Sequence, residues 1–322
     1  MKKILGLGNA LVDIMTILKS DDFLNEVGLP KGSMQLVDAD VSDEVYKKTE
    51  GLKKTIASGG SAANTIYGIA KLGAGAGYIG KINKDDELGK FFENDMESAG
   101  VDTHLITSNT PTGKAIALVS PDAERTFATY LGAAVELSGN ELDPGIFDKY
   151  DIFLLEGYLV YNEDLVMKAV EIAKAKDMMI AIDMASYNVV EDKKEFLEKI
   201  IKNYVDIVFA NEEEAKAFTG LEPEEALHKI AEDVTISVVK IGENGSMIKH
   251  DGKVYKVPAI KVNPVDTTGA GDFYAAGFLF GLTKGFSMDK CGSIGSYLAG
   301  KVTETIGAKP DKNVWEEIKK LY

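Results

Sequence analysis

The decisive stretch of the chain reads Val265-Asp266-Thr267-Thr268-Gly269-Ala270-Gly271-Asp272-Phe273-Tyr274-Ala275-Ala276-Gly277-Phe278. Small and hydroxyl-bearing residues lead into an apolar run, which predicts a helix that begins near Ala270 after a glycine turn. The first backbone N–H groups of such a helix lack partners and, together with the helix dipole, form an anion site. Asp272 places a carboxylate beside that site. This is unfavourable unless the carboxylate has a task, such as taking a proton from a hydroxyl group that attacks a phosphoryl group.

An ordinary helix start accounts for part of the same pattern. A glycine turn before a helix and an acidic residue in its first turn also stabilise helices that bind no ligand. The motif Asp266-Thr267-Thr268-Gly269 does not separate the two interpretations when it is taken alone. The complete run up to Phe278 favours the anion site.

The composition limits the classes of function. The 322 residues are 45% apolar, which suffices for one large α/β domain or two ordinary ones. A formal net charge of −15 argues against nucleic acid or an anionic membrane as a partner. No apolar run approaches the roughly 20 residues of a membrane span, and the apolar run at the N-terminus is too short for a signal peptide.

Cysteine and histidine residues give no sign of a metal centre. Cys291 is the only cysteine, so the chain has neither a disulfide framework nor a cysteine-based metal site, and we expect the reducing cytoplasm as its location. His104, His228 and His250 are scattered along the chain and form no cluster of ligands.

Short apolar runs alternate with helix-like segments and predict a parallel sheet with helices on both faces. The predicted strands are Lys3–Leu7, Gly77–Gly80, Ile152–Leu155, Met179–Ile182, Ile207–Ala210 and Ile236–Ile241, with helices near 90–99, 163–176 and 192–203. Ligands of such sheets bind at the carboxyl ends of the strands. The singled-out residues mostly fall there: Asp13, Gly157-Tyr158, Asp183, Asn211, Gly242 and the run 266–272.

A smaller β-rich part is predicted as a lid. Ala115–Val119 and Thr126–Tyr130 are β-prone runs joined by a turn, which is typical of a hairpin. We predict one domain over residues 1–322, with a lid made from residues 14–57 and 108–131. The first of these segments holds a possible strand at Met34–Val37 and a possible helix at Asp43–Leu52.

Two glycine motifs resemble known nucleotide-binding loops but fail at a decisive position. Gly6-x-Gly8 lacks the third glycine of a dinucleotide-binding turn, because Leu11 stands there. The run from Gly75 to Lys81 is close to a P-loop, but Ile82 replaces the serine or threonine that would hold Mg²⁺. Neither motif predicts a site.

The chain resembles the ribokinase/adenosine kinase family, also called phosphofructokinase-B type carbohydrate kinases, over essentially its whole length. The resemblance rests on Asn9…Asp13, Gly59-Gly60-x-x-x-Asn64, Gly80…Asp85…Gly89, Asn211-x-x-Glu214, Lys240-x-Gly242-x-x-Gly245 and the run Asp266–Asp272. It implies a ribokinase-like three-layer α/β/α fold with a central, mostly parallel sheet. It also implies a phosphotransferase that transfers the γ-phosphate of ATP to an alcohol group of a sugar or nucleoside.

The resemblance assigns residues to the phosphoryl side of the reaction. It implies Asp272 as the general base, with the backbone N–H groups of Gly269, Ala270 and Gly271 as the anion hole. Lys240, Gly242, Gly245 and Thr267 are expected along the ATP molecule. Asn211 and Glu214 are expected to position Mg²⁺ through water, although Glu214 also suits the acidic first turn of a helix.

The acceptor side is assigned in the same way. Asp13 is expected to accept hydrogen bonds from two neighbouring hydroxyl groups. The residues expected around it are Asn9, Gly59, Gly60, Asn64 and Tyr158. Tyr158 matches a position where an aromatic ring stacks on the base of adenosine, but a core aromatic residue explains it equally well.

Arg125, the only arginine of the chain, matches a lid arginine that reaches toward the phosphates in adenosine kinases. Lid closure of this kind excludes water, which otherwise competes as a nucleophile. The alternative is a chance surface residue. The resemblance also allows a K⁺ ion at Asp266 and Thr268.

The acceptor is less determined than the reaction. Many sugar kinases of the family carry Asp-x-Asn-x-Arg after the strand that ends at Asp183, and here the asparagine and arginine are absent. This favours a nucleoside, and the run 125–134 is also similar to that of bacterial adenosine kinases. We therefore expect adenosine, with ribose, fructose or a related furanose as the alternative.

Two further expectations concern partners. A binding or regulatory protein that kept the fold and lost turnover is disfavoured by the intact Asp272 and anion-hole glycines. We expect small-molecule substrates and a monomer or homodimer, since an exposed sheet edge of the lid fits either state.

Overall fold

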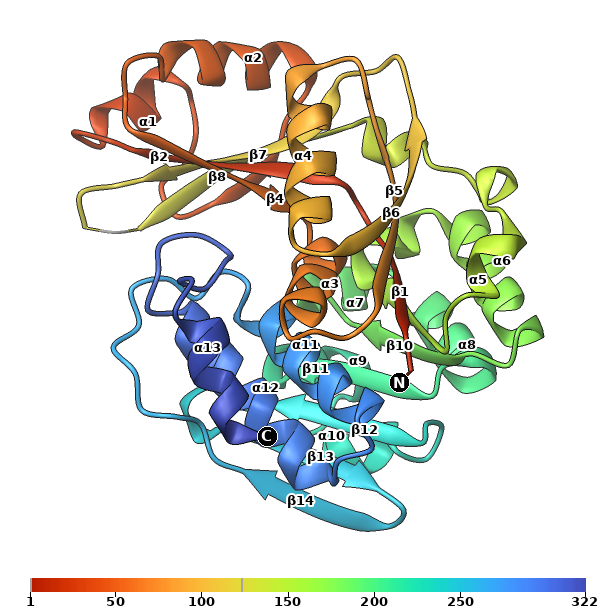
Figure 1. The fold of residues 1–322 in the computed structure, drawn as a ribbon. Helices are drawn as coiled ribbons and strands as arrows, with labels where there is room; N and C mark the ends of the chain where they lie inside the picture. Colours follow the sequence, from red (N-terminus) through yellow and green to blue (C-terminus); the bar gives the residue numbers. More distant parts are fainter. Residues whose placement is uncertain (1, 123) are drawn as a thin grey trace.

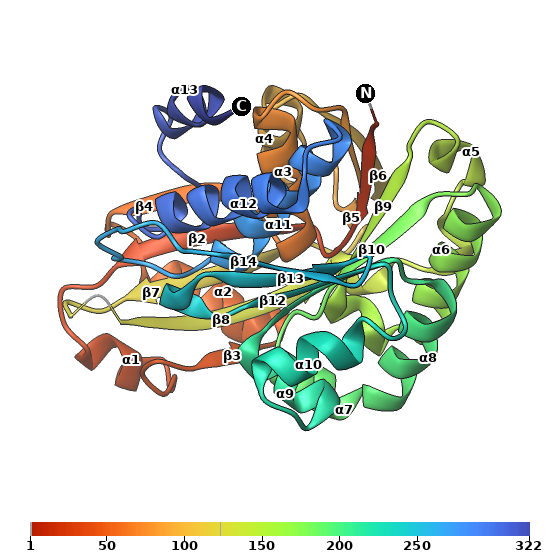
Figure 2. The same ribbon diagram turned by 90° about the horizontal axis from the view of Figure 1, so that it is seen from below.

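The computed structural model describes residues 2–122 and 124–322 and contains a large sheet covered by helices on both faces (Figure 1, Figure 2). Within these residues nine strands form the sheet, in the order β14-β13-β12-β11-β10-β9-β1-β5-β6. All pairs from β12 to β6 are parallel, while β13 and β14 add an antiparallel edge. The strands are β1 (Ile4–Leu7), β5 (Ala76–Ile82), β6 (Val101–Thr107), β9 (Ile152–Glu156), β10 (Met179–Asp183), β11 (Ile207–Asn211), β12 (Ile236–Lys240), β13 (Ser246–His250) and β14 (Lys253–Val257).

The central strands are buried on both faces, as expected for a parallel sheet between helix layers. Successive side chains of a strand point to opposite faces, so Ile152 and Leu154 enter one core while Phe153 and Leu155 enter the other. The first core is closed by α3 (Ser61–Lys71), α4 (Glu87–Ser98), α11 (Ala270–Thr283), α12 (Met288–Val302) and α13 (Val314–Ile318). The second is closed by α5 (Pro144–Phe147), α6 (Glu163–Ala175), α7 (Tyr187–Asp192), α8 (Lys194–Tyr204), α9 (Glu212–Thr219) and α10 (Pro223–Ile230). The predicted three-layer α/β/α architecture is confirmed.

A second, smaller sheet lies beside the large one, at the upper left of Figure 1. Its five strands, counted within the described residues, follow the order β3-β8-β7-β2-β4. They are β2 (Leu11–Ile17), β3 (Met34–Leu36), β4 (Lys54–Gly59), β7 (Thr112–Val119) and β8 (Arg125–Gly132). Together with α1 (Asp22–Glu26) and α2 (Ala39–Lys48) they enclose a small apolar core of their own.

Several elements differ from the sequence-based expectations. The sequence places Asp13 at the carboxyl end of the first strand, whereas it lies within a separate strand, β2, which pairs with β7 and β4. The helix expected at 43–52 is α2 at Ala39–Lys48, because the side chain of Asp38 caps it by accepting a hydrogen bond from the Val41 N–H group. The strands β4 and β6 and the β13–β14 hairpin are absent from the prediction.

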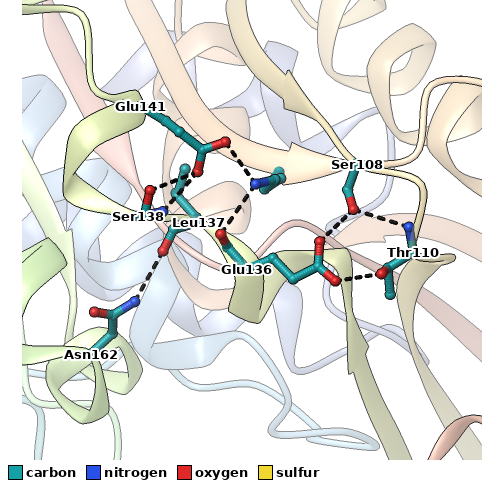
Figure 3. A network of polar contacts seen from close by, with 8 residues as sticks. Ser108, Thr110, Glu136, Leu137, Ser138, Glu141 and Asn162 are labelled. Carbon is teal, nitrogen blue, oxygen red and sulfur yellow. Dashed lines mark hydrogen bonds and ion pairs between the residues drawn. The ribbon is translucent and has the colours of Figure 1, made fainter.

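Lys81, the lysine of the near-P-loop, holds two 3₁₀ turns that follow the small sheet, Ala133–Glu136 and Gly139–Glu141. Figure 3 shows the polar contacts of Glu136 and Glu141 in these turns. The Lys81 side chain is buried, and Nζ lies 2.7 Å from Glu141 Oε1 and 3.1 Å from the backbone oxygen of Glu136. The Glu136 carboxylate in turn accepts hydrogen bonds from the hydroxyl groups of Ser108 and Thr110. An ion pair to a carboxylate and a backbone carbonyl account for the Lys81 ammonium group without any phosphate.

Candidate active site

The glycine turn and the helix start form where the sequence predicts them, and the segment Gly269–Gly271 is called the anion loop below. Helix α11 begins at Ala270, and Gly269 before it has a left-handed backbone with φ of 78°. A Cβ atom on Gly269 would lie 3.1 Å from the Cβ atom of Ala308, and one on Gly271 would lie 3.1 Å from Lys240 Nζ. Glycine at both positions keeps the start of α11 free of side chains that would crowd a ligand. The Ala270 N–H group itself donates to the backbone oxygen of Thr267 at 3.2 Å.

Asp272 lies in the first turn of α11 and is held by the beginning of α3. Its carboxylate accepts hydrogen bonds from Ser61 Oγ at 2.7 Å and Asn64 Nδ2 at 3.0 Å. Burial raises the pKa of the Asp272 carboxyl to about 7, against the lowering effect of both hydrogen bonds and of the Lys240 charge. A carboxylate with this pKa is matched to proton transfer near neutral pH.

Three charged residues, Lys240, Asp183 and Glu214, lie beside this loop. The first two end strands β12 and β10, and Glu214 lies in the first turn of α9, which follows β11. Lys240 at the end of β12 places Nζ 2.9 Å from Oδ2 of Asp183 at the end of β10. Burial raises the pKa of Glu214 to about 7, and the Lys240 charge opposes that rise. The sequence places Asp183 at a strand end but does not predict its ion pair with Lys240.

Glu214 and Asn211 form a reciprocal cap at the start of α9. The Glu214 carboxylate accepts hydrogen bonds from the backbone and side-chain nitrogens of Asn211, each at 2.7 Å. Asn211 Oδ1 accepts from the Glu214 N–H group at 2.8 Å. Glu214 thus stabilises the start of a helix, as one of the two interpretations predicts.

The same pair is compatible with Mg²⁺ held mainly by water and phosphate. Within the described part of the chain, no group of three or more His, Cys, Asp or Glu side chains is placed to bind a metal ion. Mg²⁺ at phosphate-transfer sites commonly keeps several waters and uses one or two carboxylates together with the substrate phosphates. The buried carboxylate of Glu214, at the edge of the cavity, suits that role.

A cavity of about 1280 Å³ joins the anion loop, the strand ends and the acceptor side. Most residues predicted for the site line it: Asp13, Gly60, Asn64, Tyr158, Asn211, Glu214, Lys240, Gly242, Gly245, Thr267, Thr268, Gly269, Ala270, Gly271 and Asp272. Tyr158 also packs against the second core, so both interpretations of this residue apply. Four predicted residues are outside the lining: Asn9, Gly59, Arg125 and Asp266.

Asn9 and Gly59 support the acceptor side from behind. Asn9 Nδ2 donates to Glu156 Oε1 at 2.6 Å, and the buried Glu156 carboxylate also accepts from the Ala62 N–H group of α3. The expected contact of Asn9 with the acceptor is corrected to a supporting role, because its amide is used by Glu156. A Cβ atom on Gly59 would lie 2.2 Å from Asp13 Oδ1, so only glycine leaves room for that carboxylate.

Arg125 lies against the segment that precedes the anion loop. Its guanidinium group contacts the Asp266 carboxylate at 2.5 Å and donates to the backbone oxygen of Val265 at 3.0 Å. The Asp266 carboxylate also accepts from the N–H groups of Thr268 at 2.7 Å and Gly307 at 2.6 Å. A K⁺ ion on the Asp266 carboxylate does not fit this arrangement, because the guanidinium group already supplies the positive charge.

Sequence reasoning misses two residues of this site for the same reason. Ser61 bonds to Asp272 across 211 positions of the chain, and Lys309 bonds to Ser58 across 251 positions. Ser61 occupies a variable position of the motif Gly59-Gly60-x-x-x-Asn64, and Lys309 belongs to no motif with a characteristic spacing.

No helix in residues 2–122 and 124–322 has both the length and the hydrophobicity needed to cross a membrane.

The model of the pfkB family carbohydrate kinases matches residues 32–314. A probable sugar kinase from Rhizobium etli CFN 42 has a similar structure, with a TM-score of 0.89 and 34% identity over 99% of this chain and 98% of that one. Adenosine kinase from Sinorhizobium meliloti superposes with a TM-score of 0.88 and is 35% identical, covering 100% and 99% of the two chains. A 5-dehydro-2-deoxygluconokinase from Shouchella clausii is 29% identical over 82% of this chain and 85% of its own. The chain belongs to the pfkB family of carbohydrate kinases and is a phosphotransferase.

Proposed function

We propose that this protein transfers the γ-phosphate of ATP to the 5′-hydroxymethyl group of adenosine. One observation carries the reaction type: the Asp272 carboxylate, with a pKa raised to about 7, lies in the first turn of α11, directly after Gly269–Gly271. A proton acceptor and the proposed anion site would thereby lie side by side in one cavity. This pairing is what attack of a hydroxyl group on a phosphoryl group requires.

In the proposed reaction Asp272 takes the proton of the acceptor hydroxyl group. The oxygen of that hydroxyl group attacks the γ-phosphorus, and ADP leaves. The N–H groups of Gly269 and Gly271 would then donate to the phosphoryl oxygens, on which negative charge builds up. The N–H group of Ala270 would join them once it leaves the Thr267 oxygen. Ser61 and Asn64 hold the Asp272 carboxylate in the direction of the acceptor.

On the nucleotide side, Gly242, Gly245 and Thr267 line the cavity where the ATP phosphates and ribose would lie. Lys240 carries the positive charge nearest to Gly271. When bound, Mg²⁺ neutralises charge on the ATP phosphates, and Glu214 with Asn211 would orient its waters.

On the acceptor side, Asp13 would accept hydrogen bonds from neighbouring hydroxyl groups of the sugar ring. Asn64 Oδ1 supports this location, since among the described residues it is a buried oxygen without a hydrogen-bond partner. A bound hydroxyl group would satisfy it.

Charge favours a neutral acceptor over an acidic sugar. The only lysines that line the cavity within the described residues are Lys240 and Lys261, and Lys240 is already paired with Asp183. Carboxylates are more frequent in the lining and repel an anionic acceptor. Adenosine is therefore the first candidate, and Tyr158, which lines the cavity, would stack on its base. A neutral sugar such as ribose or fructose is the second, supported by the similarity to sugar kinases.

The small sheet would act as the lid of the reaction. The contact of Arg125 on β8 with Asp266 supports this proposal, because it ties the sheet to the segment that leads into the anion loop. In that position Arg125 contacts Asp266, three positions before Gly269 of the anion loop. If the lid moved further toward the phosphates, the positive charge of Arg125 would contact the γ-phosphoryl group that is transferred.

A coupled assay of ADP formation tests the proposal with adenosine, inosine, ribose, fructose 6-phosphate, 2-keto-3-deoxygluconate and 5-dehydro-2-deoxygluconate as acceptors. We expect adenosine to give the largest kcat/KM. The Asp272→Asn variant serves as the blank for contaminating kinases. Strong turnover of a sugar without turnover of adenosine would reject the nucleoside assignment and retain the kinase.

A further inference from the structure

The segment 307–309 connects the phosphoryl side of the site to the acceptor side. The Gly307 N–H group donates to Asp266 Oδ2 at 2.6 Å, and the Cβ atom of Ala308 lies against Gly269 of the anion loop. Lys309 then extends in the other direction, to the small sheet. Its Nζ atom lies 2.6 Å from Ser58 Oγ and 2.5 Å from Asp95 Oδ2.

Lys309 is enclosed on several sides. Its side chain is 15% exposed, and Nζ lies 3.8 Å from the centre of the Tyr67 ring. Asp95 also accepts hydrogen bonds from the backbone and side chain of Ser58, at 3.0 and 2.8 Å. The ion pair therefore fixes the end of β4 to helix α4 and to the segment 307–309.

The end of β4 is also the wall behind Asp13. Ser58 pairs with Val12 and Ala57 with Asp13 in the ladder between β4 and β2. Gly59, the next residue, is in contact with the Asp13 carboxylate. A displacement of β4 would therefore move or expose the carboxylate that is proposed to bind the acceptor hydroxyls.

Charge links the same residues. Burial raises the pKa of Asp13 to about 7, the positive charge of Lys309 lowers it, and the negative charge of Asp266 raises it. Asp266 is itself paired with Arg125, which reduces its effect. Lys309 is thus the positive charge that favours the ionised form of Asp13. Asp95, Asp13 and Lys71 are the charged groups that act on Lys309 in return.

We propose that Lys309 is a positioning residue for the acceptor: it holds β4 behind Asp13 and supplies the positive charge that keeps the Asp13 carboxylate ready to accept hydroxyl groups. This inference rests on the proposed role of Asp13 in acceptor binding. It adds a residue from the far end of the chain that no motif contains.

The test is the pH dependence of acceptor binding in the Lys309→Gln variant, measured by calorimetry with adenosine in the absence of ATP. Loss of a nearby positive charge raises the pKa of a buried carboxyl by about one unit or more. A change from about 7 to about 8 lowers the ionised fraction of Asp13 at about pH 7 from about one half to about one tenth. We expect Kd to rise about fivefold at about pH 7 and to stay nearly unchanged at about pH 9, where Asp13 is ionised in both proteins.

Two further variants separate charge from structure. Lys309→Arg retains a permanent positive charge and is expected to restore the wild-type pH midpoint. Lys81→Gln is the matched control, because Lys81 is also a buried lysine in an ion pair but its charge is not among those that act on the pKa of Asp13. It is expected to lower stability without moving the midpoint.

An equal loss of affinity at about pH 7 and about pH 9 would overturn the proposal and leave Lys309 with a structural role only. If Lys309→Gln does not fold, the double variant Lys309→Gln/Asp95→Asn keeps a neutral hydrogen-bonded pair and is expected to show the same rise in midpoint. The ¹³C resonance of the Asp13 carboxyl, assigned with Asp13→Asn, gives a readout that needs no acceptor. If adenosine does not bind, the proposed acceptor is wrong, while this titration still decides the role of Lys309.

Discussion

Replacing Asp272 by asparagine is expected to abolish most turnover and, near neutral pH, to stabilise the protein. Asparagine has the same shape as aspartate. Its side-chain oxygen can accept from Asn64 Nδ2, and its amide can donate to the Ser61 hydroxyl, which both donates and accepts hydrogen bonds. The exchange therefore removes a base and a charge with little change in packing.

The magnitude follows from the pKa of the carboxyl, which burial raises from 3.8 to about 7. Between these two values the unfolded chain has released the proton and the folded chain has kept it. Ionisation thus costs stability as pH rises through this range. Between about pH 5 and about pH 8 this ionisation lowers the free energy of unfolding of the wild type by about 2.5 kcal/mol. The variant lacks the carboxyl group and therefore lacks this loss. Loss of a positioned general base lowers kcat by at least about 10²-fold.

Urea unfolding at about pH 5 and about pH 8, together with steady-state kinetics, measures both effects. The stability advantage of Asp272→Asn over the wild type should increase by about 2.5 kcal/mol between the two pH values. Asp85→Asn, at an exposed loop position, is the control for replacing an aspartate by an asparagine where the carboxylate is not buried. A stability difference that is independent of pH would refute the buried-carboxylate reasoning, and near wild-type turnover would refute the assignment of Asp272 as the base.

Four further predictions concern residues in and around this cavity. Ser61→Ala removes a hydrogen bond that lowers the pKa of Asp272, so the acid limb of the kcat–pH profile should move to higher pH; an unmoved limb would contradict it. Arg125→Lys should reduce kcat about tenfold or more, because lysine lacks the planar guanidinium group that contacts Asp266 and the Val265 oxygen together; an unchanged rate would show that Arg125 has no part in the reaction. Wild-type turnover should be the same in K⁺ and choline salts, and strict K⁺ dependence would show that the Arg125–Asp266 pair opens. Glu214→Gln should raise the Mg²⁺ concentration needed for half-maximal rate about tenfold or more, as read from a Mg²⁺ titration at saturating ATP; an unchanged requirement would leave Glu214 as a helix cap.

Local patterns predicted the large sheet and the anion loop. The strands β9, β10, β11 and β12 appear as short apolar runs, because both faces of a parallel sheet are buried. The start of α11 is visible because a glycine turn before an apolar helix is a local signal. The small sheet was only partly visible: β3, β7 and β8 correspond to predicted runs, whereas β4 is partly exposed and carries no apolar run.

The roles of side chains were harder to predict than the elements that carry them. Asn9 and Lys81 look like ligands in the sequence, yet Glu156 and Glu141 use their polar groups. Arg125 stands out as the only arginine, but its partner Asp266 lies 141 positions further along the chain. An ion pair or hydrogen bond between distant residues leaves no periodic trace in the sequence.

The sequence by itself determined the family, the reaction type and the residues of the run 266–272, because a helix start that binds an anion depends on neighbours within one turn. Only the tertiary structure decided in which direction the pKa values of Asp272 and Asp13 are shifted. Their pKa values depend on burial and on charges such as Lys240 and Lys309, which reach them from distant strands and loops. Electrostatic effects act through space, so the fold, and not the order of residues, sets which charges are close enough to matter.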